Sequence, residues 1–132
     1  MAGTITVSTI NDSSGVLATQ NGMTGIAKAW VMFNGTGTVS IYGSFNVSSI
    51  TDNGTGDYTI NFTTAMPNAN YNVVGNASNT GVYSGVCVQI NSTSSGGNLT
   101  SAPTTTTARL VVSQPNVGYV DCAYVTASIF SS

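Results

Sequence analysis

The sequence contains no histidine and no glutamate, and only six of its 132 side chains carry a charge. The charged fraction of 5% lies far below the roughly 25% of ordinary soluble domains. Without histidine there is no Ser-His or Cys-His nucleophile pair and no imidazole ligand for zinc. We therefore predict a protein that is not an enzyme and has no catalytic residues, cofactor or metal ligands. The four aspartates leave a two-carboxylate glycosidase as the catalytic alternative.

The shortage of positive charge excludes several classes of partner. Lys28 and Arg109 are the only cationic side chains. A nucleic-acid-binding surface needs a basic face, and adsorption to an anionic membrane needs a basic cluster. No apolar run approaches the ~20 residues of a membrane span, and residues 1–12 show no pattern of a secretory signal. We predict no nucleic-acid binding and no membrane insertion.

The sequence has two cysteines, Cys87 and Cys122, and they fit no metal or redox spacing. Both fall in strand-like runs, which favours small buried residues with free thiols. A chain without a signal matures in a reducing cytosol, where disulfides are rare. A disulfide between neighbouring strands is the alternative.

Alternating and β-branched residues dominate the chain, whereas strong helix formers are scarce. About eight short strands at turn-separated spacing predict an all-β protein, an antiparallel sandwich or a small barrel. We favour a jelly-roll-like sandwich over residues 25–132, preceded by an N-terminal strand and a polar connection over residues 1–24. The expected strands are residues 4–10, 26–33, 38–47, 57–63, 70–77, 82–90, 108–112 and 117–125. In the strand at 57–63 we expect Tyr58, Ile60 and Phe62 to face inward. Gly43 interrupts the apolar face of the strand at 38–47, which predicts a bulge or a close approach there.

The strand expected at residues 26–33 is apolar on both faces. One face is assigned to the core, which leaves Trp30 and Met32 on the other beside Lys28. Tryptophan and methionine are enriched in protein interfaces, and charged residues are depleted from interface cores. We predict that Trp30 and Met32 form a subunit interface; a sugar-stacking role for Trp30 is the alternative.

The sequence Asn-Gly-Thr-Gly occurs twice, at residues 34–37 and 53–56. Asn-Gly tolerates the positive φ of tight hairpin turns, so the two copies predict successive hairpins in a three-stranded meander. Asp52 and Asp57 bracket the second copy and could bind a calcium ion. The first copy makes the same turn without a carboxylate, which favours Asp52 bonded to the turn backbone and Asp57 in water.

The longest low-complexity segment spans residues 91–107. Long loops on a rigid β scaffold are common places for binding residues, although a simple connector is an equal alternative. The candidate contact residues of this loop are Thr93, Asn98, Thr100 and Thr104.

Three runs stand out within Gly25–Val74: AKAWVMFNGTG at Ala27–Gly37, SFNVSSITDNGTGDYT at Ser44–Thr59 and FTTAMPNANY at Phe62–Tyr71. Together they resemble a module of tailed-bacteriophage virion surface proteins, often called tail-fibre-like and common in phages of aquatic bacteria. Met32 departs from the module, which would carry a polar residue at that position.

This resemblance implies a virion surface protein that is made in the host bacterial cytoplasm. It would be a fibre or fibre tip, assembled as a homotrimer, that contacts other virion proteins and a host-surface glycan or protein. Residues 4–10 would dock to the particle. The alternative is a decoration protein that stabilises or studs the capsid.

Overall fold

A computed structural model describes residues 3, 26–78, 87–90 and 102–131 of the chain. Within these ranges there are nine strands and no helix, so no helix that could span a membrane is found there. The strands expected at residues 4–10 and at 82–86, and the division of the chain at residue 24, lie outside the described residues. The strands are β1 (Ala29–Asn34), β2 (Ser40–Phe45), β3 (Val47–Gly54), β4 (Asp57–Phe62), β5 (Asn72–Ala77), β6 (Cys87–Ile90), β7 (Thr107–Gln114), β8 (Gly118–Tyr119) and β9 (Val125–Phe130).

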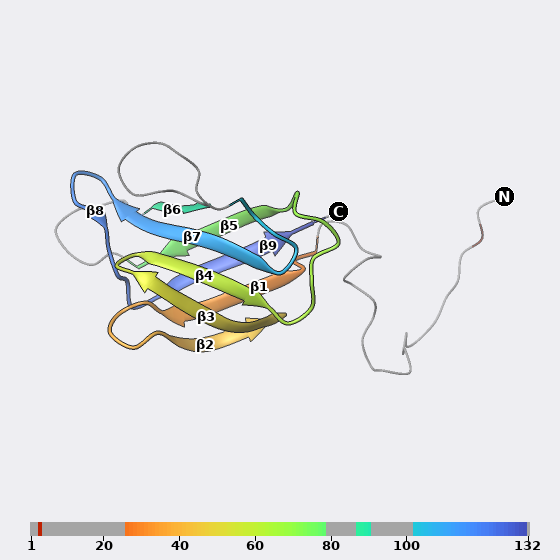
Figure 1. Ribbon diagram of the computed structural model, residues 1–132, viewed down its shortest axis with the longest axis horizontal. Helices are drawn as coiled ribbons and strands as arrows, with labels where there is room; N and C mark the ends of the chain where they lie inside the picture. The colour runs from red at the N-terminus through yellow and green to blue at the C-terminus, as the bar shows by residue number, and fades with distance from the viewer. Residues whose placement is uncertain (1–2, 4–25, 79–86, 91–101, 132) are drawn as a thin grey trace.

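The strands form two antiparallel sheets that pack face to face (Figure 1). Sheet A has the order β2-β1-β9-β5, and sheet B has the order β3-β4-β7-β6 with the short β8 paired to β7. The predicted all-β antiparallel architecture is confirmed. Residues 26–28 and 131 lie at the same end of the sandwich, because Lys28 N donates to Ile129 O at 2.7 Å and Ala29 pairs with Ile129.

One hydrophobic core fills the space between the sheets. In β4 the alternation of the sequence places Tyr58, Ile60 and Phe62 inward and buried, as predicted. The rings of Phe33 in sheet A and Tyr58 in sheet B meet edge to face with centroids 5.0 Å apart. Each such side chain contributes about 1.5–3 kcal/mol when it leaves water, so these contacts hold the layers together.

The predicted three-stranded meander is wrong, because the two hairpins lie in different sheets. The chain leaves β2 and enters β3 through Asn46, whose φ is 56°. The Asn46 side chain donates to Lys28 O at 3.1 Å and accepts from Thr64 N at 2.7 Å. Asparagine tolerates this left-handed conformation better than most residues, and its amide ties the crossing to both sheets.

The prediction for the C-terminal part of the chain is also wrong. The run at residues 117–125 forms only β8 and an irregular segment, and the strand that follows it, β9, was not predicted. β9 is nevertheless central in sheet A, between β1 and β5, and buries Val125, Ala127 and Ile129. Its sequence VTASIF alternates and is rich in strand formers, so the signal for this strand was present and was overlooked.

Glycine positions explain two features of sheet A. The predicted irregularity at Gly43 is confirmed as a bulge: Met32 pairs with Gly43 and Phe33 with Ile41, which leaves Tyr42 as the extra residue. Gly75 in β5 faces sheet B, and a Cβ there would lie 2.5 Å from Val88 Cγ1. The sheets therefore approach closely along the β5–β6 side.

The two Asn-Gly-Thr-Gly turns are joined by a buried polar contact. Tyr58 Oη lies 2.7 Å from Asp121 Oδ1 and 2.9 Å from the Gly35 carbonyl, and Gly56 N donates to the same Asp121 oxygen at 2.7 Å. Burial and the hydrogen bond to Asp121 raise the pKa of Tyr58, which keeps its hydroxyl protonated. Gly35 N also donates to Cys122 O at 2.9 Å. Both turns are thus hydrogen-bonded to residues 121–122.

Cys122 is a buried free thiol, as the sequence favoured. Burial raises its pKa, and the negative charge of Asp121 acts in the same direction. The side chain of Cys87 lies outside the described residues.

We expect Gly35→Ala to lower the free energy of unfolding by about 1–3 kcal/mol. The added Cβ would lie 2.4 Å from Tyr58 Oη and 3.0 Å from Cys122 O, so the turn at Gly35 would have to move away from both residues. Urea denaturation followed by tryptophan fluorescence would measure the change.

Gly43→Ala is the matched control, because its Cβ would meet the Trp30 ring at an ordinary 3.5 Å. We expect it to leave stability within about 1 kcal/mol of wild type. Equal losses in the two variants would contradict the role given to Gly35.

Candidate functional site

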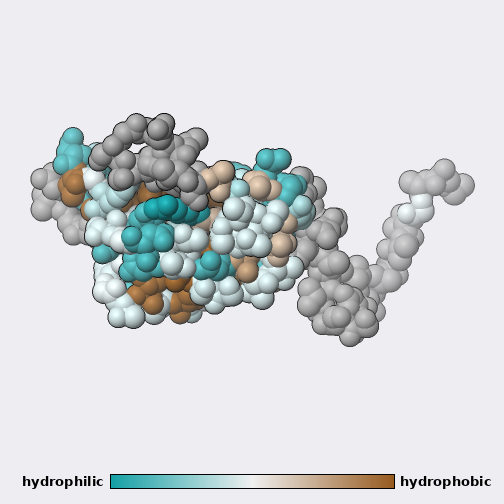
Figure 2. Space-filling model, viewed as in Figure 1, coloured by the Kyte–Doolittle hydropathy of each residue, from teal (hydrophilic) through white to brown (hydrophobic). Residues whose placement is uncertain are grey.

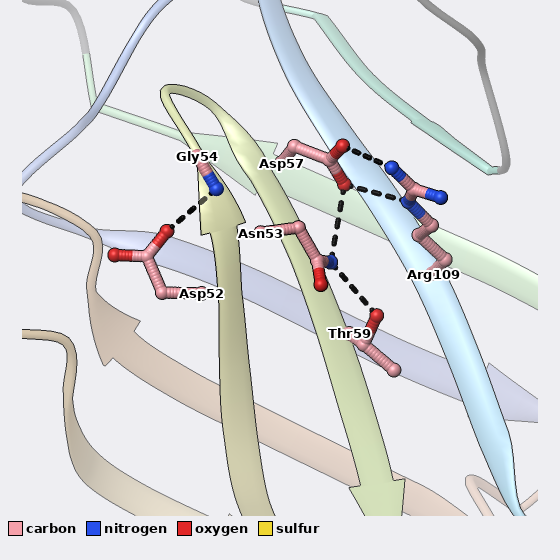
Figure 3. Close-up of polar contacts among 6 residues, drawn as sticks. All are labelled: Asp52, Asn53, Gly54, Asp57, Thr59 and Arg109. Atoms are coloured by element: carbon pink, nitrogen blue, oxygen red, sulfur yellow. Dashed lines mark hydrogen bonds and ion pairs between the residues drawn. The ribbon is translucent and has the colours of Figure 1, made fainter.

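The most polar cluster lies on the outer face of sheet B, around Asp57 and Arg109 (Figure 3). Arg109 Nε donates to Asp57 Oδ1 at 2.8 Å, and Arg109 Nη2 donates to Oδ2. β4 and β7 are hydrogen-bonded neighbours, which brings the two side chains together although they are far apart in sequence. The prediction that Asp57 sits in water is therefore wrong.

The turn that precedes β4 completes this cluster. Asn53 Nδ2 donates to Asp57 Oδ1 at 3.3 Å and to Thr59 Oγ1 at 2.9 Å. Asp52 Oδ1 accepts from Gly54 N at 2.9 Å, so the predicted bond between Asp52 and the turn backbone is confirmed. The two aspartates that bracket the turn have different partners and do not act as a pair.

Electrostatics within the cluster disfavour a cation beside Asp57. The hydrogen bond from Arg109 is the main cause that holds the pKa of Asp57 below its usual value. Both carboxylate oxygens face the guanidinium, whose positive charge would repel a calcium ion. In the described part of the chain, no three His, Cys, Asp or Glu side chains are grouped to hold a metal. The geometry gives calcium binding no support.

Neutral side chains on β3 and β4 extend the polar surface away from the ion pair. Asn61 Nδ2 donates to Ser49 Oγ and to Thr51 Oγ1, both at 3.0 Å. These side-chain bonds connect β4 to β3. Figure 2 shows teal patches over β3, β4 and β7 and only small brown areas. The polar groups of β3 and β4 on this face are largely bonded to one another.

The outer face of sheet A has the opposite character. Strand register places Trp30 opposite Phe45 on one side and Ser128 on the other, and Ser128 opposite Val74. Trp30, Phe45 and Val74 are exposed, Trp30 by 42%. These four residues, called the Trp30 row, cross all four strands without a charge. Met32 lies two residues farther along β1 and is partly buried, whereas Lys28 is buried rather than beside Trp30 on the surface.

A hollow of about 250 Å³ lies on sheet A, at the end opposite residues 26–28 and 131. We call it the Tyr124 hollow; its lining is Asn76, Ala77, Ser78, Tyr124 and Thr126. The Tyr124 ring contacts that of Tyr42 with centroids 5.5 Å apart. These residues were missed by sequence reasoning. The break in alternation at Gly43, next to Tyr42, was the one available signal of irregular structure there.

Of the predicted contact loop, Thr93, Asn98 and Thr100 lie outside the described residues, and only Thr104 is described. Thr104 is exposed, but its Oγ1 accepts from Thr107 N at 2.9 Å and from Thr106 N at 3.2 Å. Its carbonyl accepts from Tyr71 Oη at 3.1 Å, and burial raises the pKa of Tyr71 to about 12, so the hydroxyl remains a donor. Thr104 therefore has a structural role at the start of β7.

No protein-family model, curated protein or solved structure matched the chain. The described residues offer three surface regions: the bonded polar face of sheet B, the uncharged Trp30 row and the Tyr124 hollow. Only the latter two present exposed aromatic side chains, which supply contact area in binding sites.

We expect Asp57→Asn to destabilise the protein by about 1–2 kcal/mol at pH 7 through loss of the charged hydrogen bonds to Arg109. The pKa of Asp57 is lowered on folding, so its contribution is complete above the unfolded value of about 3.9 and disappears as the pH falls through the folded value. Urea denaturation at pH 7 and at pH values below 4 should show the gap between wild type and variant closing on acidification.

Asp52→Asn removes the same charge but retains an oxygen that can accept from Gly54 N. We expect this control to cost less than about 0.5 kcal/mol. A gap for Asp57→Asn that stays constant with pH would contradict the ion-pair explanation.

Proposed function

We propose that the chain is a bacteriophage virion surface protein of the fibre or fibre-tip type, assembled as a homotrimer and mediating attachment to the host surface. It would be made in the bacterial cytoplasm and act at the surface of the particle. The resemblance of the three runs within Gly25–Val74 supports this proposal. These runs include β1, β3, most of β4 and both glycine turns. Tyr58 and Asp121 join the two turns at one end of the sandwich.

The observation that carries the proposal is the Trp30 row. Exposed aromatic and aliphatic side chains on an uncharged row of a sheet are characteristic of the core of a subunit interface. A threefold arrangement would bury Trp30 and Met32 from each subunit without removing a charge from water. The trimer thus accounts for the exposure of the Trp30 row in a single chain.

The sheet topology supports a jelly-roll-like arrangement. Strands β1 and β2 lie in sheet A, β3 and β4 in sheet B, β5 in sheet A, β6 and β7 in sheet B, and β9 returns to sheet A. Repeated crossing between two four-stranded sheets is typical of such double-sheet folds.

A binding role agrees better than catalysis with how the charged groups are used. Asp57 pairs with Arg109, and Asp52 and Asp121 bond to turn backbone. Each of these carboxylates stabilises local structure. A glycosidase needs two carboxylates flanking one substrate bond, and the described aspartates are committed elsewhere.

We expect Trp30→Glu to convert a trimer to a monomer with an unchanged fold, because three buried carboxylates would meet in the interface. Light scattering coupled to gel filtration would show the mass falling to one third, while circular dichroism stays the same. Val117→Glu is the control, since Val117 is exposed in the turn before β8 and off the Trp30 row. A monomeric wild-type chain at micromolar concentration would contradict the proposed trimer.

Locating the chain in a cryo-electron-microscopy map of the particle tests the virion role directly. Density at the tip of a fibre supports host attachment. A copy number that matches capsid symmetry would instead favour the decoration protein, with the Trp30 row packed against the capsid shell. Absence of the chain from purified particles would contradict both.

A further inference from the structure

We propose that the Tyr124 hollow binds a neutral sugar unit of a host-surface glycan. This inference rests on the proposed attachment function and assigns it to a site other than the loop at residues 91–107. The hollow combines an exposed aromatic ring with amide and hydroxyl groups and has no charged side chain in its lining.

Two hydrogen bonds to Ser78 fix the backbone at Tyr124. Ser78 N donates to Tyr124 O at 2.8 Å, and Tyr124 N donates to Ser78 Oγ at 3.2 Å. This reciprocal pair joins the segment before β9 to the end of β5. A ring on a fixed backbone can take up a ligand with little loss of conformational entropy.

Tyr42 supports the ring from the neighbouring side. The bulge opposite Met32 and Phe33 leaves Tyr42 as the extra residue of β2, and its hydroxyl donates to Ala123 O at 3.3 Å. The planes of the two tyrosine rings are inclined by 34°. Bulges re-aim side chains beside binding sites, and here the bulge places a second exposed ring against Tyr124.

The polar groups of the hollow suit sugar hydroxyls. Asn76 Oδ1 accepts from Ala77 N at 2.9 Å. The Nδ2 group of the same amide is the one that can donate to a sugar hydroxyl. Thr126 Oγ1 donates to Asn76 O at 3.2 Å and, among the described residues, accepts no bond; Ser78 Oγ accepts from Tyr124 N at 3.2 Å and, among the described residues, donates none. Donors and acceptors thus surround an aromatic face, which is the combination that orients a sugar ring by hydrogen bonds and stacking.

The size and charge of the hollow restrict the ligand. Its volume of about 250 Å³ is below the roughly 300–1,000 Å³ of pockets that enclose drug-sized ligands. It fits one sugar unit at the exposed end of a chain. An acidic sugar or a phosphate would find no cation in the lining to compensate its charge.

The position of the hollow agrees with contact to an external surface. It lies at the C-terminal end of β5 and the start of β9, whereas residues 26–28, 131 and Thr104 lie at the opposite end of the sandwich. If the N-terminal region faces the particle, the Tyr124 hollow faces away from it. The hollow also adjoins Met32, since Met32 pairs with Thr126, so a neighbouring subunit would border it on one side.

Titration of the isotope-labelled full chain with glucose, galactose, mannose or N-acetylglucosamine tests the site by nuclear magnetic resonance. We expect at least one sugar to shift the amide signals of residues 76–78 and 124–126, with a Kd on the order of 1 mM. Tyr124→Ala should weaken binding at least about tenfold through loss of the stacking surface, whereas Tyr124→Phe should retain it.

Val117→Ala is the matched control, because Val117 and Tyr124 are both 51% exposed; it should bind as wild type does. Shifts confined to other residues, no shifts with any of the four sugars, or wild-type binding by Tyr124→Ala would overturn the site.

Competition with phage adsorption separates this inference from the proposed function. If the wild-type chain competes with phage adsorption and the Tyr124→Ala chain does not, the result supports both the attachment function and the sugar site. Equal competition by the two chains supports host attachment but overturns the hollow as the contact. Sugar binding at the hollow by a wild-type chain that does not compete supports the sugar site and contradicts the attachment function.

Discussion

The hydroxyl of Tyr58 and the carboxylate of Asp121 hold both glycine turns and both sheets together at one end of the sandwich. Tyr58 comes from sheet B, Gly35 follows β1 of sheet A, and Asp121 lies on the segment that leads into β9. A buried donor or acceptor that loses its partner costs about 1–3 kcal/mol. Because four polar groups share this contact, namely Tyr58 Oη, Asp121 Oδ1, Gly35 O and Gly56 N, small displacements of either turn are resisted.

The chain uses its few charges inside its own structure. Arg109 and Asp57 connect β7 and β4, and Asp121 connects the turns. Among the described residues, the Trp30 row and the lining of the Tyr124 hollow therefore carry no charged side chain, and sheet B presents bonded hydroxyls and amides around its ion pair. Recognition on such a surface depends on shape, stacking and hydrogen bonds, which agrees with the proposed subunit contact and sugar site.

Local patterning predicted at least part of β1, β2, β4, β5, β6 and β7, whereas β3 and β9 were not predicted and the strand expected at residues 38–47 runs through the crossing at Asn46. The alternation of Tyr58, Ile60 and Phe62 and the irregularity at Gly43 were read correctly, as was the burial of Cys122. Features that depend on partners distant in sequence could not be read. No residue near Asp57 in the sequence indicates that Arg109 is its partner. The chain crosses to the other sheet at Asn46, and no sequence pattern predicts the left-handed φ of that residue. The Tyr124 hollow was not predicted for the same reason: it is built from β5, the bulge in β2 and the segment before β9, which are far apart in the sequence.

The central place of β9 affects the order in which the surface of sheet A can form. β1 and β5 have no hydrogen bonds to each other, because β9 lies between them. Pairings between strands so distant in sequence form slowly. During synthesis on the ribosome, the Trp30 row stays incomplete until Ser128 has emerged and β9 has been inserted. Nascent chains therefore lack the complete Trp30 row, and association through the proposed subunit interface has to wait for β9.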